Sequence, residues 1–141
     1  MDKKITREIS LGKNVPYVYK YDPEQLVAFP RLEKREELGL SFELPFSGVD
    51  IWHIFELCWL DRKGKPVMAT GRFSVPATSN SIVESKSVKL YLVSFSQSKF
   101  DSIKHVEQAI QKDLSIRVGS LVNVELSPVH TENNQDFDTM P

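Results

Sequence analysis

The sequence has one cysteine, three histidines and no apolar run long enough to cross a membrane. The single cysteine, Cys58, excludes an internal disulfide framework and fits a reducing compartment. His53, His105 and His130 lie in unlike segments without the short spacing of metal ligands, so the sequence gives no support for a zinc cluster. Residues 1–6 are not followed by an apolar signal core. We therefore expect a cytoplasmic protein without a metal.

An excess of one charge sign is also missing. The chain carries 18 basic and 19 acidic residues, a net charge of −1. A global basic field of the kind that attracts duplex nucleic acid or an anionic membrane is therefore absent from the composition. Any phosphate ligand must be bound by a local site.

The 141 residues are 40% hydrophobic, 10% aromatic and 26% charged. These fractions are typical of an ordinary globular protein, and the length is that of one domain. Residues 1–48 lack a sustained period but carry aromatic anchors between prolines, so we expect an irregular N-terminal arm that lies across the domain. Within it, residues 22–26 predict one short helical turn.

Residues 49–60 predict a strand that is apolar on both alternating faces. One predicted face carries Ile51, His53, Phe55, Leu57 and Trp59, and the other carries Trp52, Ile54, Glu56, Cys58 and Leu60. Such a strand must be covered on both sides, by helices on one and by another sheet or subunit on the other. The turn chemistry of residues 61–65 predicts a hairpin whose second strand is residues 67–75.

Residues 84–95 place Val88, Tyr91, Leu92 and Phe95 at the i, i+3, i+4 and i+7 spacing of a helical stripe. Part of the run, through Val88, Leu90 and Leu92, also fits the period of a strand. We interpret the run as a helix that packs its apolar stripe against a core.

The start of this helix has an unusual charge. Ser85 is the candidate N-cap, and Lys86 and Lys89 follow in the first turn. Because that end of a helix carries partial positive charge, it normally recruits Asp or Glu. Broken local rules are most often found at functional sites, although a capped helix with two solvated lysines is the simplest alternative.

A second helix is expected after Asp101, its candidate cap, with an apolar stripe through Ile103, Val106, Ile110 and Leu114. Residues 121–126 then predict a strand, and residues 115–118 a further one before a turn at residues 119–120. The order is strand, strand, helix, helix, strand, strand. It is an α+β pattern over residues 49–127, with an antiparallel sheet and two helices on one face. The polar residues 128–141 are typical of the start of a linker to a further module.

The run Glu84-Ser85-Lys86-Ser87-Val88-Lys89-Leu90-Tyr91 resembles the signature of the NADPH-dependent 7-cyano-7-deazaguanine reductases, nitrile reductases of queuosine tRNA-modification biosynthesis. Upstream, Leu44-Pro45-Phe46, Gly48, Asp50-Ile51-Trp52 and Glu56-Leu57-Cys58-Trp59-Leu60 are similar to the N-terminal module of the two-module branch. The resemblance implies the tunnelling fold, in which units pair through their sheets around shared sites. It also implies a C-terminal module as partner, and we expect a homo-oligomer, as a homodimer, through sheet pairing. The charge balance and the lack of a long apolar run lead us to expect no nucleic acid or membrane partner.

The resemblance also implies site residues. Lys86 and Lys89 would bind the NADPH phosphates, and Ser85 would cap the helix and contact both ligands. Glu84 and the backbone of Val83 would contact the deazaguanine. A carboxylate suits that role because it accepts hydrogen bonds from the amino and ring N–H groups of a guanine-like edge.

The chain departs from the family at the catalytic positions. Single-module relatives carry a nucleophilic cysteine before the hairpin turn and an aspartate just after it, whereas here Cys58 precedes the turn and Val67 follows it. Phe100-Asp101-Ser102 stands where the family has a His-Glu pair. Glu56 would raise the pKa of Cys58, which favours a structural cysteine. We expect no catalytic residue in this chain, which alone would be inactive, and place the nucleophile and acid in the C-terminal module.

Two functional hypotheses follow. In the first, the chain is a module of the reductase and contributes ligand-binding residues. In the second, it is a non-catalytic assembly domain that keeps the signature only because the helix packs well. Trp52 and Trp59 are assigned to opposite strand faces, which favours packing over a stacking platform for single-stranded nucleic acid.

Overall fold

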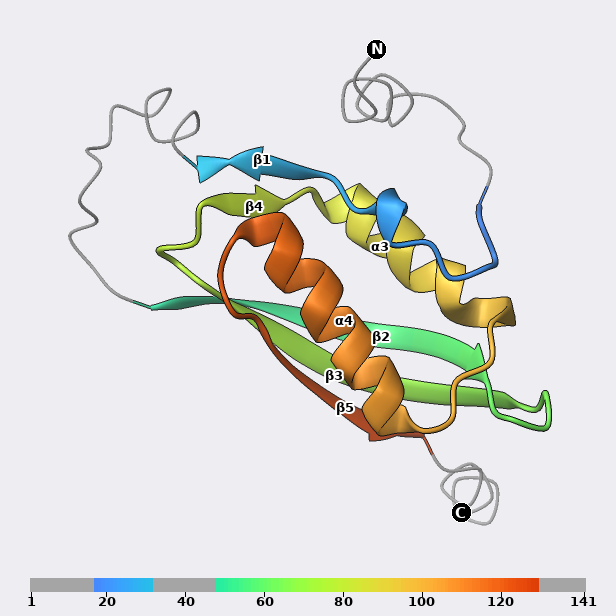
Figure 1. The fold of residues 1–141 in the computed structure, drawn as a ribbon. Helices are drawn as coiled ribbons and strands as arrows, with labels where there is room; N and C mark the ends of the chain where they lie inside the picture. Colours follow the sequence, from blue (N-terminus) through green and yellow to red (C-terminus); the bar gives the residue numbers. More distant parts are fainter. Residues whose placement is uncertain (1–16, 32–47, 130–141) are drawn as a thin grey trace, which may run out of the picture.

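The computed structural model describes residues 17–31 and 48–129. The elements in chain order are η1 (Pro23–Gln25), β1 (Ala28–Pro30), β2 (Val49–Leu60), β3 (Pro66–Pro76), β4 (Ser81–Val83), α3 (Ser85–Val93), η2 (Ser94–Gln97), α4 (Ile103–Val118) and β5 (Asn123–Pro128). The strands form two antiparallel sheets, one of order β1-β4 and one of order β2-β3-β5 (Figure 1). The predicted α+β class is confirmed.

Strands β2 and β3 form the predicted hairpin, which is the backbone of the larger sheet. Its turn is closed by Asp61, whose Oδ1 accepts hydrogen bonds from the amides of Lys63 and Lys65, both at 2.9 Å. A register shift between Ile54 and Leu57 interrupts the pairing. Because of this bulge, Ile54 and Leu57 are both buried, so the predicted strict alternation of faces along β2 is wrong.

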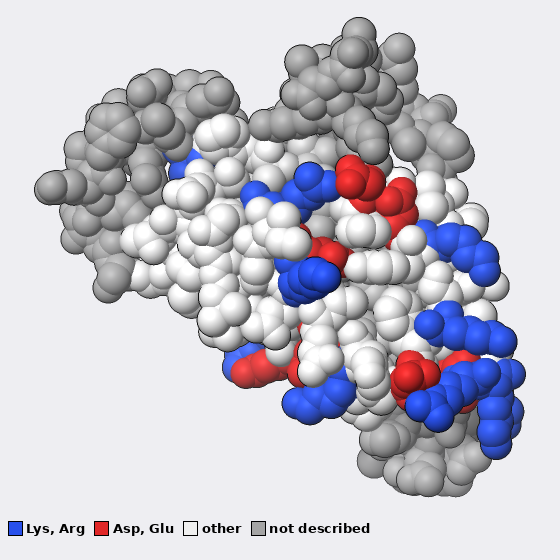
Figure 2. Space-filling model, viewed as in Figure 1, with Lys and Arg blue, Asp and Glu red and all other residues white. Residues whose placement is uncertain are grey.

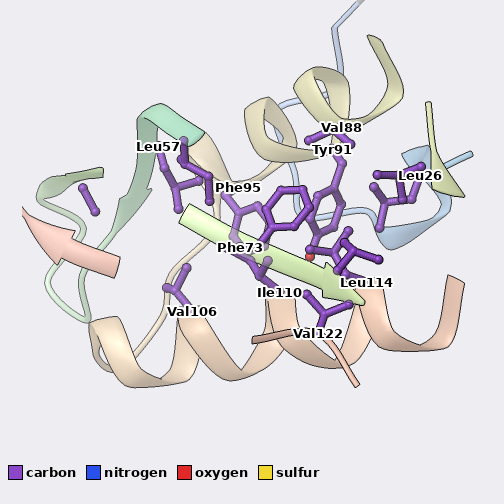
Figure 3. Packing of buried hydrophobic residues seen from close by; sticks show 14 of the residues in the cluster. Leu26, Leu57, Phe73, Val88, Tyr91, Phe95, Val106, Ile110, Leu114 and Val122 are labelled. Carbon is purple, nitrogen blue, oxygen red and sulfur yellow. The ribbon is translucent and has the colours of Figure 1, made fainter. Parts of the chain in front are cut away.

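Helices α3 and α4 lie over the same face of the larger sheet, as predicted (Figure 1). Their apolar side chains meet those of the sheet in one core (Figure 3). The core includes Ile54, Leu57, Trp59, Phe73 and Val75 from the sheet, Val88 and Tyr91 from α3, and Val106, Ile110, Leu114 and Val118 from α4. On the β2–β3 hairpin, Val49, Ile51, Phe55 and Met68 are instead between 40% and 82% exposed.

Helix α4 differs from its prediction at both ends. Its N-cap is Ser102, whose Oγ accepts the amide of His105 at 3.2 Å, so the prediction of Asp101 as cap is wrong. At the other end the helix continues to Val118 and ends at Gly119, whose φ of 73° is the left-handed conformation that glycine adopts readily. The predicted strand at residues 115–118 is therefore wrong, and in the part of the chain that the structure describes β5 follows α4.

The N-terminal segment is more ordered than predicted. The short turn expected at residues 22–26 is η1, capped by Asp22. The next residues form β1, which pairs with β4 and was not predicted, and Leu26 is only 2% exposed. We call residues 19–31 the strap, because they lie along β4 and α3 (Figure 1). The predicted boundaries after residues 48 and 127 stay predictions, since residues 32–47 and 130–141 lie outside the described part.

A buried carboxylate ties the strap to both helices. Asp113 of α4 is 9% exposed, and its Oδ2 accepts hydrogen bonds from the hydroxyls of Tyr91, at 2.6 Å, and Tyr21. Burial, together with the negative charge of Asp113, raises the pKa of both tyrosines far above its ordinary value. Both phenols therefore stay neutral in the folded state.

This pKa shift predicts a loss of stability in alkali. Tyrosines of the unfolded chain ionise near pH 10, whereas Tyr91 in the fold retains its proton. The stabilisation is complete below pH 10 and is lost as pH rises further, by about 1.4 kcal/mol per pH unit for Tyr91. Urea denaturation of the wild type and Tyr91→Phe at neutral and alkaline pH measures this slope. An unchanged slope in Tyr91→Phe would contradict the assignment.

Candidate functional site

The start of α3 is built around the side chain of Glu84. Glu84 has extended backbone angles and is the N-cap, so Ser85 is the first helical residue and the prediction of Ser85 as cap is wrong. The Glu84 carboxylate turns back over the helix end, where Oε1 accepts the amide of Lys86 at 3.0 Å and Oε2 the amide of Ser87 at 2.7 Å. The acidic group that a helix start normally recruits is therefore present one position before the helix.

Three predicted site residues lie together on the outer side of this first turn. Ser85, Lys86 and Lys89 are all exposed. Spacings of three and four residues place Lys89 beside both of the others on the helix surface. The buried residues Val88 and Tyr91 occupy the opposite side, which faces the core. The structure thus brings the hydroxyl and the two ammonium groups to one exposed surface at the positive end of the helix.

The backbone before the helix is held by the strap. Val83 is the last residue of β4, is 5% exposed and is paired with Ala28 of β1. The amide of Glu84 donates to the carbonyl of Val27 at 2.9 Å. Val83 and Glu84, two of the three predicted substrate-binding residues, are therefore held by a two-stranded sheet, in which no described strand pairs with the other edge of β4.

Cys58 lies apart from this surface, on β2. It is half-buried, and burial together with the carboxylate of Glu56 raises the pKa of its thiol. A raised pKa lowers the thiolate fraction that a nucleophile needs at neutral pH. Val67 pairs with Trp59 on the neighbouring strand and supplies no acid there. That the chain carries no catalytic cysteine stays a prediction.

The remaining candidate groups have structural partners. Asp101 accepts a hydrogen bond from Nε of Arg62 at 2.9 Å, and this pairing lowers the pKa of the carboxyl group. Phe100 packs against Tyr21 and Phe95. Among residues 17–31 and 48–129, no group of three or more His, Cys, Asp or Glu side chains is placed to bind a metal. In the same ranges, no helix is long and apolar enough to cross a membrane.

Charged side chains of both signs are interspersed on the face shown in Figure 2. This distribution agrees with the net charge of −1. Because the described part of this face has no extended basic surface, an anion there would have to be bound by a small local group of basic residues. At the start of α3 the amides of Lys86 and Ser87 already donate to Glu84, so those two cannot also bind a phosphate. An anion there would be bound by the lysine ammonium groups, which are strongly hydrated point charges on flexible stems.

The carboxylate of Glu84 retains binding capacity beyond its role as a cap. An ionised carboxylate has about four lone-pair sites, and the two amides occupy one on each oxygen. Each oxygen can accept one further hydrogen bond from a ligand. The arrangement therefore offers acceptors for N–H donors next to ammonium groups for an anion.

Sequence comparisons identify the family. A family model described as "Nitrile reductase, 7-cyano-7-deazaguanine-reductase N-term" matches residues 17–126. This range includes β1 through most of β5, and therefore the whole of α3 with Ser85, Lys86 and Lys89.

Several curated relatives are named NADPH-dependent 7-cyano-7-deazaguanine reductase. The relative from Burkholderia orbicola is 46% identical over 130 residues, which are 92% of this chain and 47% of the relative. The relative from Desulfotalea psychrophila is 48% identical over 126 residues, 89% of this chain and 46% of the relative. The chain spans about half the length of the curated relatives it matches. It belongs to the family of the N-terminal part of the 7-cyano-7-deazaguanine nitrile reductases.

Proposed function

We propose that this chain is the N-terminal module of an NADPH-dependent reductase that converts 7-cyano-7-deazaguanine to 7-aminomethyl-7-deazaguanine in queuosine biosynthesis. The observation that carries the proposal is the start of α3, where a carboxylate with spare acceptor capacity lies beside an exposed pair of lysines. A purely structural helix start needs the cap but does not need both lysines.

In this proposal the module binds ligands and orients them. Lys86 and Lys89 bind the phosphates of NADPH, and the hydroxyl of Ser85 contacts the cofactor and the substrate. Glu84, with the backbone of Val83, accepts hydrogen bonds from the guanine-like edge of the substrate. NADPH, when bound, supplies the hydride. The nucleophilic cysteine and the acid come from a C-terminal module, so the chain ending at Pro141 would not reduce the nitrile alone.

The partner surface fits the same proposal. The apolar side chains of Val49, Ile51, Phe55 and Met68 are exposed on the β2–β3 hairpin. We expect these side chains to be covered by another sheet or subunit, either the C-terminal module or a second copy in a homodimer. A cytoplasmic location would follow from the substrate, a precursor of a tRNA nucleoside.

Charge reversal at the two lysines tests the proposal. In the full-length protein, Lys86→Glu/Lys89→Glu should weaken NADPH binding about thirtyfold, because two attractive contacts with phosphate become repulsive. The unfolding temperature should change little, since both side chains are exposed. Isothermal titration calorimetry with NADPH measures the affinity.

Lys112→Glu is the matched control, because it changes the charge of an exposed lysine on α4 instead. NADPH affinity should be retained in this variant. Unchanged NADPH affinity in the double variant would support the second hypothesis, a non-catalytic assembly domain, and would contradict a ligand-binding role for the helix start.

A further inference from the structure

Ser87, the second serine of the signature run, is fully buried and was given no role by the sequence. Its hydroxyl accepts the amide of Val27 in the strap at 3.0 Å and donates to the carbonyl of Glu84 at 2.7 Å. Its own amide donates to the carboxylate of Glu84 at 2.7 Å. Ser87 is thus bonded to Glu84 at both the backbone and the side chain, and to the strap.

We propose that Ser87 is a positioning residue that sets the direction of the Glu84 carboxylate by locking the strap to the helix start. This inference rests on the proposed function, in which that carboxylate binds the substrate. Val27 is held at two points, since its amide is bonded to Ser87 and its carbonyl to the amide of Glu84. These bonds fix the backbone of Glu84 on both sides, and the carboxylate reaches the amides of Lys86 and Ser87 from that backbone.

Ser94 provides an internal comparison at the other end of α3. It is also fully buried, its Oγ accepts the amide of Asp22 in the strap at 3.1 Å, and it donates to the carbonyl of Tyr91 three residues earlier. The two serines therefore make the same pattern of bonds between strap and helix. Of the two, Ser87 is the one bonded to a predicted ligand-binding residue.

The matching bonds of Ser87 and Ser94 allow a controlled comparison in the full-length protein. Ser87→Ala and Ser94→Ala each remove one buried hydroxyl, so their unfolding temperatures should fall by similar amounts. Ser87→Ala should also weaken binding of 7-cyano-7-deazaguanine about tenfold, whereas Ser94→Ala should leave it unchanged. Calorimetric titration with the substrate measures the affinity. Equal losses of affinity in both variants, or none in either, would overturn the positioning role.

A second measurement separates this inference from the proposed function. Hydrogen exchange of the amides of residues 27, 86 and 87 should accelerate in Ser87→Ala, and that of residue 22 in Ser94→Ala. If the wild type bound no substrate, the proposed function would fail, while exchange at residues 86 and 87 would still decide whether Ser87 holds the carboxylate. Unaltered exchange there would refute the inference. If Ser87→Ala does not fold, Ser87→Cys and Ser94→Cys give the same comparison, since a thiol is a weak hydrogen-bonding group of similar size.

Discussion

Replacement of Glu84 by aspartate should leave α3 capped and weaken binding of 7-cyano-7-deazaguanine about 100-fold. Aspartate is among the preferred N-cap residues, and glutamate is not. The shorter side chain of Asp still reaches the amides of Lys86 and Ser87, which accept it as a standard cap. Its carboxylate, however, is withdrawn by one methylene from any ligand outside the helix. Two charge-assisted hydrogen bonds are then lost, which accounts for the expected factor.

Glu84→Asp should therefore lose affinity for the substrate without losing stability. Thermal unfolding of Glu84→Asp should occur at or slightly above the temperature of the wild type, while calorimetric titration shows the loss of substrate affinity. Glu84→Ala is the comparison that removes both roles, so it should lose about 1 kcal/mol of stability in addition to the affinity. If Glu84→Asp bound the substrate as the wild type does, Glu84 would be a helix cap alone.

Some parts of the candidate site could be predicted from the sequence, and others could not. The helix and its exposed lysines could be predicted, because Val88 and Tyr91 of α3 and Phe95 of η2 repeat at helical spacing and all three are buried. The cap could not, since statistics favour Ser85 over Glu84. The contribution of Ser87 was hidden for another reason. Its partner Val27 is 60 residues away in the chain, and no local pattern reports that contact.

The errors in the fold have equally specific causes. The β-branched residues Ile116 and Val118 suggested a strand at residues 115–118, but Val118 continues the buried stripe of Ile110 and Leu114 at intervals of four, and tertiary packing decides the conformation. The pair β1-β4 was missed because each strand has three residues, too few to show a period. The β2 bulge has no sequence signal, so the face assignments from Leu57 to Leu60 were inverted.

The central strand contains the position where substitution should be most damaging to the fold. Gly71 of β3 faces Leu126 of β5 in the register, and a Cβ atom there would lie 2.1 Å from the carbonyl oxygen of Glu125 and 3.0 Å from Cα of Leu126. These are backbone atoms, so a rotamer change does not relieve the overlap. Strand β5 is also held by helix α4, because the amide of Leu126 donates to the Glu107 carboxylate of α4 at 3.0 Å.

Gly71→Val should therefore destabilise the protein by at least about 3 kcal/mol, the upper end of the range for overpacked cores. Urea denaturation measures the loss, and hydrogen exchange should show it first in the amides of β5, including that of Leu126, as the β3–β5 pairing opens. Thr70→Val places the same side chain one position earlier, at an exposed residue of the same strand, and should be nearly neutral. Because α4 packs on β5 and supplies Glu107, separation of β5 should also loosen the helix layer that supports α3. A stable Gly71→Val protein with protected β5 amides would show that the β3–β5 contact is wider than the structure has it.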